Sequence, residues 1–159
     1  MPFEHICVGV DFSETSRDAL RIAARLAADT ARLTLVHVWH AAHPYSTFSG
    51  DELRAVVESD EVAMKALVRE AHDLGATNVT TVFLAGNPAD EIVELAHKDS
   101  TIELVVVGTH GRTGLAHVLL GSVAEKIVRR APCAVLAIPA IGARARRRSA
   151  RQPAAASVH

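Results

Sequence analysis

Short apolar runs alternate along the chain with longer segments of helical periodicity, and this alternation limits the fold more than any other feature of the sequence. The five runs are HICVGV (5–10), RLTLVHVW (32–39), NVTTVFLA (78–85), IELVVVG (102–108) and CAVLAI (133–138). Such short, β-branched and nearly continuous apolar runs are typical of strands buried on both faces. Because helices connect successive parallel strands by right-handed crossovers, the pattern predicts an α/β fold with a single open five-stranded parallel sheet and helices on both faces.

The first two helices are marked by a capping serine and a terminal glycine. Ser13 is placed to cap the first helix, whose expected apolar face is formed by Ala19, Ile22, Ala23 and Leu26. The second helix is expected from about Asp51 to Gly75, a residue suited to a helix end. Its expected apolar face comprises Leu53, Val56, Val57, Met64, Leu67, Val68, Ala71 and Leu74.

Two shorter helices are expected after the third and fourth strands. Asn87 is suited to cap the first of them, with Pro88 at its first helical position and acidic residues in its first turn. The other is expected from Ser122 to about Arg130.

Composition describes the core and the expected compartment. The core must be aliphatic, since 49% of the residues are hydrophobic and only 4% are aromatic. Cys7 and Cys133 form no CxxC pair and are expected to be small buried hydrophobes in a reducing compartment. No apolar run approaches the roughly 18 residues of a membrane span, and residues 1–10 lack the basic-then-apolar order of a secretion signal. A cytoplasmic protein is therefore expected.

The last 20 residues differ in composition from the rest of the chain. Residues 140–159 contain no acid and five arginines, namely Arg144, Arg146, Arg147, Arg148 and Arg151. Without these five, 12 basic residues stand against 18 acidic ones, so residues 1–139 carry a net charge of about −6. The sequence predicts a folded domain over 1–139 and a basic disordered tail over 140–159. A solvated tail is favoured over contact with nucleic acid or another anionic surface.

A glycine-spaced loop follows the fourth apolar run directly. It reads GTHGRTGLAHVLLGS over 108–122. Open parallel sheets bind ligands outside the carboxyl ends of their strands, which is where this loop begins. Glycines let backbone N–H groups approach an anion, and the helix that begins at Gly121–Ser122 offers more such groups. A phosphate site is favoured over a long surface loop with an ordinary serine cap.

The turn after the first strand carries an acid in place of a phosphate-binding motif. The chain has no GxxxxGK[ST] motif, and VGVDFSETS lacks the GxGxxG of dinucleotide-binding folds. A carboxylate at Asp11 suits a ribose hydroxyl or a metal. The simplest division places an adenine half near the first two strands and a phosphate half at the glycine loop.

These residues resemble the ATP-binding universal stress proteins. Gly108-x2-Gly111-x9-Gly121-Ser122 fits their G-x2-G-x9-G-[ST] pattern, and VGVDFSETS, LVHV, GNPADEIVELA, GTHGRTG and SVAEKIVRRAPCAVLAIP resemble family blocks in the same order. The resemblance covers about 2–139. It implies strand order 3-2-1-4-5, the adenine nucleotide alpha hydrolase-like arrangement, with Asp11 and the glycine loop side by side.

The resemblance also implies a binding site for ATP with Mg²⁺. It puts Asp11 and the backbone of Val10 and Val38 near adenine and ribose. The residues that it puts near ribose and phosphates are Gly108, Thr109, His110, Gly111, Arg112, Gly121, Ser122 and Val123. A nucleotide-dependent regulatory or stress-response module follows from this assignment.

The fifth strand is an edge strand in that order, and CAVLAI carries no charge. Exposed edges are normally blunted by charge, bulges or cover. A homodimer through the fifth strand (Cys133 to Ile138) is therefore predicted, in agreement with the common dimer of the family. The alternative is a monomer in which the basic tail covers this edge.

Neither a metal centre nor an efficient catalyst is predicted. His37, His40 and His43 recur every third residue, but a strand points the first two to opposite faces. No general base stands beside an activated nucleophile, and a P-loop lysine is missing. Enzymatic activity is left uncertain, at most weak ATP hydrolysis. The alternatives are a slow Mg-dependent ATPase, a nucleotide-independent dimeric stress or interaction protein, and a cyclic AMP binder.

Overall fold

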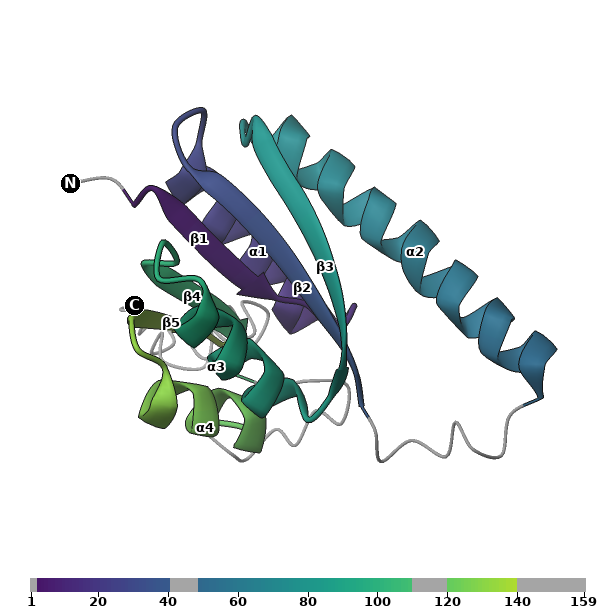
Figure 1. Ribbon diagram of the computed structural model, residues 1–159. Coiled ribbons are helices and arrows are strands. Elements are labelled where there is room, and N and C mark those ends of the chain that lie inside the picture. Colours follow the sequence, from purple (N-terminus) through teal and green to yellow (C-terminus); the bar gives the residue numbers. More distant parts are fainter. Residues whose placement is uncertain (1–2, 41–48, 110–119, 140–159) are drawn as a thin grey trace, which may run out of the picture.

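In the computed structural model, strands and helices alternate along the chain as the sequence predicts (Figure 1). The structure describes residues 3–40, 49–109 and 120–139. The strands are β1 (His5–Gly9), β2 (Arg32–His40), β3 (Asn78–Gly86), β4 (Leu104–Gly108) and β5 (Ala134–Ile138). The helices are α1 (Glu14–Ala27), α2 (Gly50–Asp73), α3 (Pro88–Lys98) and α4 (Ser122–Arg130). These bounds agree closely with the sequence prediction.

The five strands form one parallel sheet in the order β3-β2-β1-β4-β5. The predicted α/β fold and strand order are therefore confirmed. β1 is central and pairs with β2 through Val8 and Leu35 and with β4 through Val8 and Val106. The chain winds outward from β1 in both directions, so the carboxyl ends of β1 and β4 form the point where the strand order reverses.

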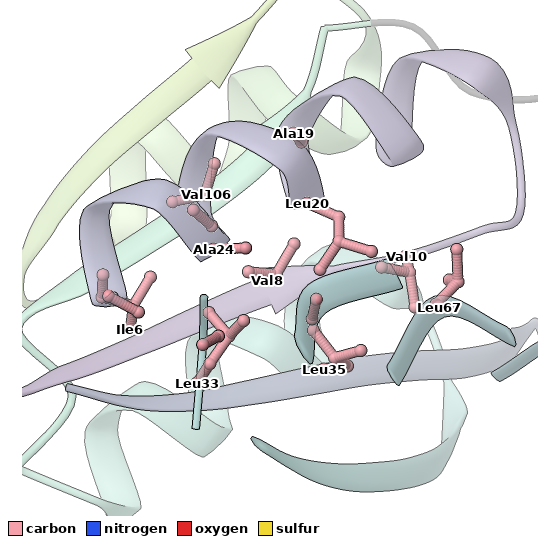
Figure 2. Close-up of a cluster of buried hydrophobic side chains, with 14 of the residues drawn as sticks. Ile6, Val8, Val10, Ala19, Leu20, Ala24, Leu33, Leu35, Leu67 and Val106 are labelled. Atoms are coloured by element: carbon pink, nitrogen blue, oxygen red, sulfur yellow. The ribbon is translucent and has the colours of Figure 1, made fainter. Parts of the chain in front are cut away.

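Side chains alternate between two cores, one on each face of the sheet. Figure 2 shows the first core, where Ile6, Val8 and Val10 of β1 and the following turn meet Leu20 of α1 and Leu67 of α2. The second core lies under α3 and α4 and includes the buried residues Cys7, Val36, Val105, Ile92 and Ile127. Burial on both faces explains why β1 and β4 read as continuous apolar runs.

Local capping signals account for the helix starts. Ser13 is the N-cap of α1 and accepts a hydrogen bond from the Ser16 N–H, and Asn87 caps α3 through the N–H groups of Ala89 and Asp90. Gly75 follows α2 with φ +100°, a conformation that favours glycine. These predicted caps are confirmed.

The apolar faces of α1 and α2 are less buried than predicted. Leu26 is 43% exposed and Leu53 is 41% exposed. Only Met64, Leu67 and Ala71 are buried on α2. For α2 the physical reason is that the helix lies at the margin of the sheet, beside the edge strand β3 (Figure 1).

Both cysteines are free thiols. Cys7 is fully buried, and burial raises its pKa to about 12. Cys133 packs against the second core but is only half-buried, which corrects the prediction that it is buried. Its partial burial also raises the pKa of the thiol. Neither group favours the thiolate that reactive cysteines need.

A buried polar cluster closes the amino end of the sheet around His5, which is 3% exposed. Its Nε2 lies 2.8 Å from Thr34 Oγ1, and its Nδ1 lies 2.9 Å from Thr101 Oγ1 and 3.0 Å from an Arg32 guanidinium nitrogen. A guanidinium only donates, so Nδ1 accepts and the ring is neutral with its proton on Nε2. Burial, and next the positive charge of Arg32, lower the pKa of His5 below its ordinary value.

Acidification is therefore expected to destabilise the protein through His5. Because the folded state holds the pKa below 6.5, the stabilisation is complete above that pH and is lost as pH falls below it. The loss can reach about 1.4 kcal/mol per pH unit for one proton. Urea unfolding between pH 7.5 and 5 measures this loss. His5→Gln should flatten the pH profile, and substitution of the exposed His97 of α3, His97→Gln, serves as the control. Equal profiles for His5→Gln and the unsubstituted chain would contradict this assignment.

None of the helices in the described part of the chain is long and apolar enough to cross a membrane.

Candidate functional site

The end of β4, the end of β5 and the start of α4 are joined through the backbone of Thr109. The Thr109 N–H donates to the Ile138 carbonyl at 2.8 Å, and the Thr109 carbonyl accepts from the Gly121 N–H at 2.7 Å. Thr109 is 5% exposed. Gly121 therefore lies at the carboxyl end of β4, although 110–119, which fall outside the described residues, separate the two along the chain.

The start of α4 has the features of an anion site. Gly121 is the N-cap residue, with φ −71° and ψ 159°, and none of the described side chains caps the helix. Ser122 and Val123 are exposed helical residues, so Ser122 does not act as the ordinary cap considered from sequence. Free N–H groups at a helix start attract negative charge.

Gly108 is needed for packing at the same place. A Cβ at this position would lie 2.8 Å from Thr15 Cγ2 and 3.0 Å from the Thr15 carbonyl carbon. The absence of a side chain lets the first turn of α1 approach the end of β4. The sequence suggested ligand approach for this glycine, and the structure adds this contact between two elements.

Asp11 is held in a fixed turn between β1 and α1. Its Oδ1 accepts from the Ser13 N–H at 3.1 Å and from the Ser13 hydroxyl at 2.5 Å. Its own N–H donates to Ser16 Oγ at 3.3 Å. Phe12 has φ 63°, which turns the chain sharply between the strand and the helix. The carboxylate is thus oriented at the carboxyl end of β1, next to the point where the strand order reverses.

Val10 and Val38 lie at the carboxyl ends of β1 and β2. The Val10 N–H donates to the Val36 carbonyl at 2.8 Å, and Val38 is 8% exposed. The Val10 carbonyl lies 2.8 Å from His37 Nδ1, and since a carbonyl only accepts, Nδ1 carries the proton. His37 therefore positions the backbone next to Asp11.

An aromatic cluster beside Val10 was missed by sequence reasoning. His37 packs against Phe12 with ring centroids 4.5 Å apart, and Trp39 stacks on Phe83 at 5.2 Å. Asp60 of α2 accepts from Trp39 Nε1 at 2.9 Å. The usable signal was the spacing of His37 and Trp39, two residues apart in a strand and so on one face.

The remaining predicted site residues, His110, Gly111 and Arg112, lie outside the described residues, as does His43. In the described ranges, no group of three or more His, Cys, Asp and Glu side chains is arranged to hold a metal ion. The predicted site residues that the structure describes are Val10, Asp11, Val38, Gly108, Thr109, Gly121, Ser122 and Val123. They lie in β2, β4 and α4 and in the segments that follow β1 and β4 and precede α4.

Comparison with known proteins identifies the family. The universal stress protein family model matches residues 2–139. The chain is 36% identical over 146 residues to universal stress protein A homolog 1 of Coxiella burnetii, covering 87% of this chain and 97% of the relative. It is similar to the solved structure of hypothetical protein MJ0577, with TM-score 0.78, 26% identity and coverage of 87% and 97%.

A universal stress protein crystallised in complex with cAMP is also similar in structure. Its TM-score is 0.66 with 27% identity, and the match covers 88% of this chain and 99% of that one. The fold, the family model and the curated relative agree over nearly the whole described domain. This chain belongs to the universal stress protein family.

Proposed function

We propose that the protein binds ATP with Mg²⁺ at the carboxyl ends of β1 and β4 and acts as a nucleotide-dependent regulatory module. The observation that carries this proposal is the start of α4, which Thr109 holds at the end of β4 and which no side chain caps within residues 3–40, 49–109 and 120–139. Its N–H groups suit phosphate oxygens. The similar protein solved with cAMP supports an adenine nucleotide as the ligand class.

The described residues divide between the parts of such a ligand. Asp11 is assigned to a ribose hydroxyl, and the backbone of Val10 and Val38 to adenine. Gly121 and Ser122 are assigned to the phosphates, together with His110, Gly111 and Arg112 of the loop. The Asp11 carboxylate and the Ser122 hydroxyl are oxygen groups of the kind that Mg²⁺ prefers, so the site fits a phosphate-bound ion. Magnesium bound there would neutralise phosphate charge.

Ligand released from the purified protein tests the proposal without choosing a ligand beforehand. Mass spectrometry is expected to detect an adenine nucleotide, and added ATP with Mg²⁺ should raise the Tm, because a ligand of the native state stabilises it. Cyclic AMP is the second candidate, favoured by the similar complex. A larger Tm rise with cyclic AMP than with ATP would select it, and no rise with either nucleotide would refute the proposed function.

Hydrolysis of ATP is expected to be far slower than the roughly 1–1000 per second of typical enzymes. Asp11 Oδ1 already accepts two hydrogen bonds from Ser13, and a P-loop lysine is missing from the sequence. Steady-state phosphate release measures turnover. Turnover above about one per second that disappears in Asp11→Ala or Ser122→Ala would show a catalyst instead.

We also propose a homodimer through β5, which lies at one edge of the sheet. Ala134 is exposed, Leu136 is half-buried, and the strand carries no charge. Leu136→Lys should give a monomer, since a buried unpaired charge at the contact is costly. Light scattering on the full chain, a chain ending at Ala140 and Leu136→Lys should give dimer, dimer and monomer. If the chain dimerised only after removal of the tail, the tail would be identified as the segment that covers the β5 edge in a monomer.

A further inference from the structure

The other edge of the sheet is formed by β3, and its outer backbone groups have no partner in the described residues. β3 pairs with β2 along its full length, from Asn78 to Gly86. Within residues 3–40, 49–109 and 120–139, β3 makes no backbone hydrogen bond to any other element. The strand contains no charged residue and no proline. It therefore lacks the charged residues and prolines that commonly keep an edge strand from pairing.

A groove lies along this edge, between β3 and α2, which stands beside it (Figure 1). Its volume is about 720 Å³. Apolar side chains line it from both elements, namely Met64, Val68, Val79 and Phe83. A strand added to the sheet would lie about 4.8 Å from β3, and alternate side chains of that strand would face these apolar residues.

The α2 wall of the groove is predominantly positive. Lys65 and Arg69 line it one helical turn apart, together with a single acid, Glu61. In the described part of the chain neither cation forms an ion pair, whereas Arg17 and Arg21 of α1 both bind Glu70. Two such cations beside an apolar floor complement a segment that carries acidic residues.

We propose that this groove docks an extended peptide segment that adds a strand to the outer edge of β3. Its alternate apolar side chains face Val68, Val79 and Phe83, and its acidic residues pair with Lys65 and Arg69. Main-chain hydrogen bonds supply affinity in this mode, and side-chain pockets supply specificity. A second copy of the chain fits less well, because its β3 carries no acid and its own groove wall would bring two more cations, Lys65 and Arg69, against the single acid Glu61.

The fluorescence of Trp39 can report whether the groove is occupied. Phe83 lines the groove and stacks on Trp39, with ring centroids 5.2 Å apart and planes inclined by 21°. Trp39 is the only tryptophan of the chain. Contact with Phe83 should therefore change the fluorescence of the protein.

The probe is the synthetic peptide acetyl-EEVTVTVEE-amide, added to the full-length protein at low salt. It should change Trp39 fluorescence saturably and slow amide hydrogen exchange in β3. The control peptide acetyl-EEVTPPVEE-amide keeps the charges and two of the three valines but lacks the N–H groups of two adjacent residues, which point to opposite edges of a strand. One lost N–H therefore faces β3 in either strand direction, so this peptide should bind weakly. Lys65→Glu with Arg69→Glu should weaken binding of the first peptide about tenfold, as expected when two rim attractions become repulsions. Arg54→Glu, on the same helix outside the groove, is the control for charge and should change affinity by less than about twofold.

Four results would overturn the proposal. Equal binding of the proline peptide would exclude strand addition. If the double variant keeps its circular dichroism and binds the peptide with unchanged affinity, the α2 wall does not contribute to binding. Self-association of the protein that protects β3 amides from exchange and excludes the peptide would identify a second copy as the occupant. All of these measurements are made without added nucleotide, and Trp39 lies near the proposed nucleotide site, so hydrogen exchange in β3 is the deciding readout. Failure of the peptide to protect β3 would overturn this proposal and leave the proposed function unaffected.

Discussion

Gly121→Val, combined with Gly111→Val, is expected to abolish the rise in Tm that ATP and Mg²⁺ produce. Gly121 is the N-cap of α4, where phosphate oxygens would meet the free N–H groups of the helix. A branched side chain there would stand between ligand and backbone. Gly111 lies outside the described residues, so its contribution rests on the sequence pattern. The loss of affinity should exceed about 100-fold if two or more charge-assisted hydrogen bonds are removed.

The variant should still fold, which makes the result interpretable. Gly121 has φ −71° and ψ 159°, an extended conformation that valine adopts readily. The expected cost of a poor N-cap is about 1 kcal/mol. Gly50→Val, at the first position of α2, is a matched glycine-to-valine control distant in sequence from the site, and a Cβ there meets nothing within 4 Å. Calorimetric titration with ATP reports the outcome; a folded double variant with unchanged affinity would exclude the loop as the phosphate site.

Gly108→Ala is expected to reduce the free energy of unfolding by about 1–3 kcal/mol, the range for overpacking a tight contact. The added methyl group would lie 2.8 Å from Thr15 Cγ2 and 3.1 Å from the Thr15 carbonyl oxygen. Because Thr15 lies in the first turn of α1, which must then shift, the turn that holds Asp11 should shift with it. Urea unfolding measures the stability change, and ATP titration should show weaker binding.

Two further variants separate the clash from other effects of alanine. Thr15→Ser removes Cγ2 but leaves the backbone contacts, so it should restore part of the lost stability in the Gly108→Ala background. Gly50→Ala meets no atom within 4 Å and replaces a helical glycine, so it should stabilise by about 0.4–1 kcal/mol. If Gly108→Ala left the free energy of unfolding unchanged, α1 would be able to move away from β4 without loss of stability.

The order of the elements was predictable because each signal is local. Ser13, Asn87 and Gly75 act on neighbouring backbone groups, and the apolar runs of β1 and β4 require only burial on both faces. The strand order came from the family resemblance, and the observed sheet confirms it. The exposure of Leu53 was not predictable, because helical periodicity identifies a face but not how far a helix extends past its sheet.

The positions of Asp11 and Gly121 in the fold were predictable from the sequence, but the contacts that support them were not. Asp11 and Gly121 are where the sequence placed them, at the strand ends and the start of α4. The contact of Gly108 with Thr15 and the stacking of Trp39 on Phe83 join residues far apart in sequence, and they depend on packing and strand register. The phosphate-binding roles assigned to His110, Gly111 and Arg112 remain predictions.

The two polar arrangements of the sheet stand at opposite ends of the strands. His5, Arg32 and Thr101 form the cluster at the amino ends, and Asp11 with Ser13 occupies the carboxyl end of β1. A random library of this chain should therefore yield two separable classes of variant. Selection for heat resistance would retain His5 while tolerating change around Asp11, and selection for a new ligand would alter the Asp11 end while leaving the His5 end intact. Under the proposed function, ligand preference would therefore change at the Asp11 end while the His5 end maintains the fold.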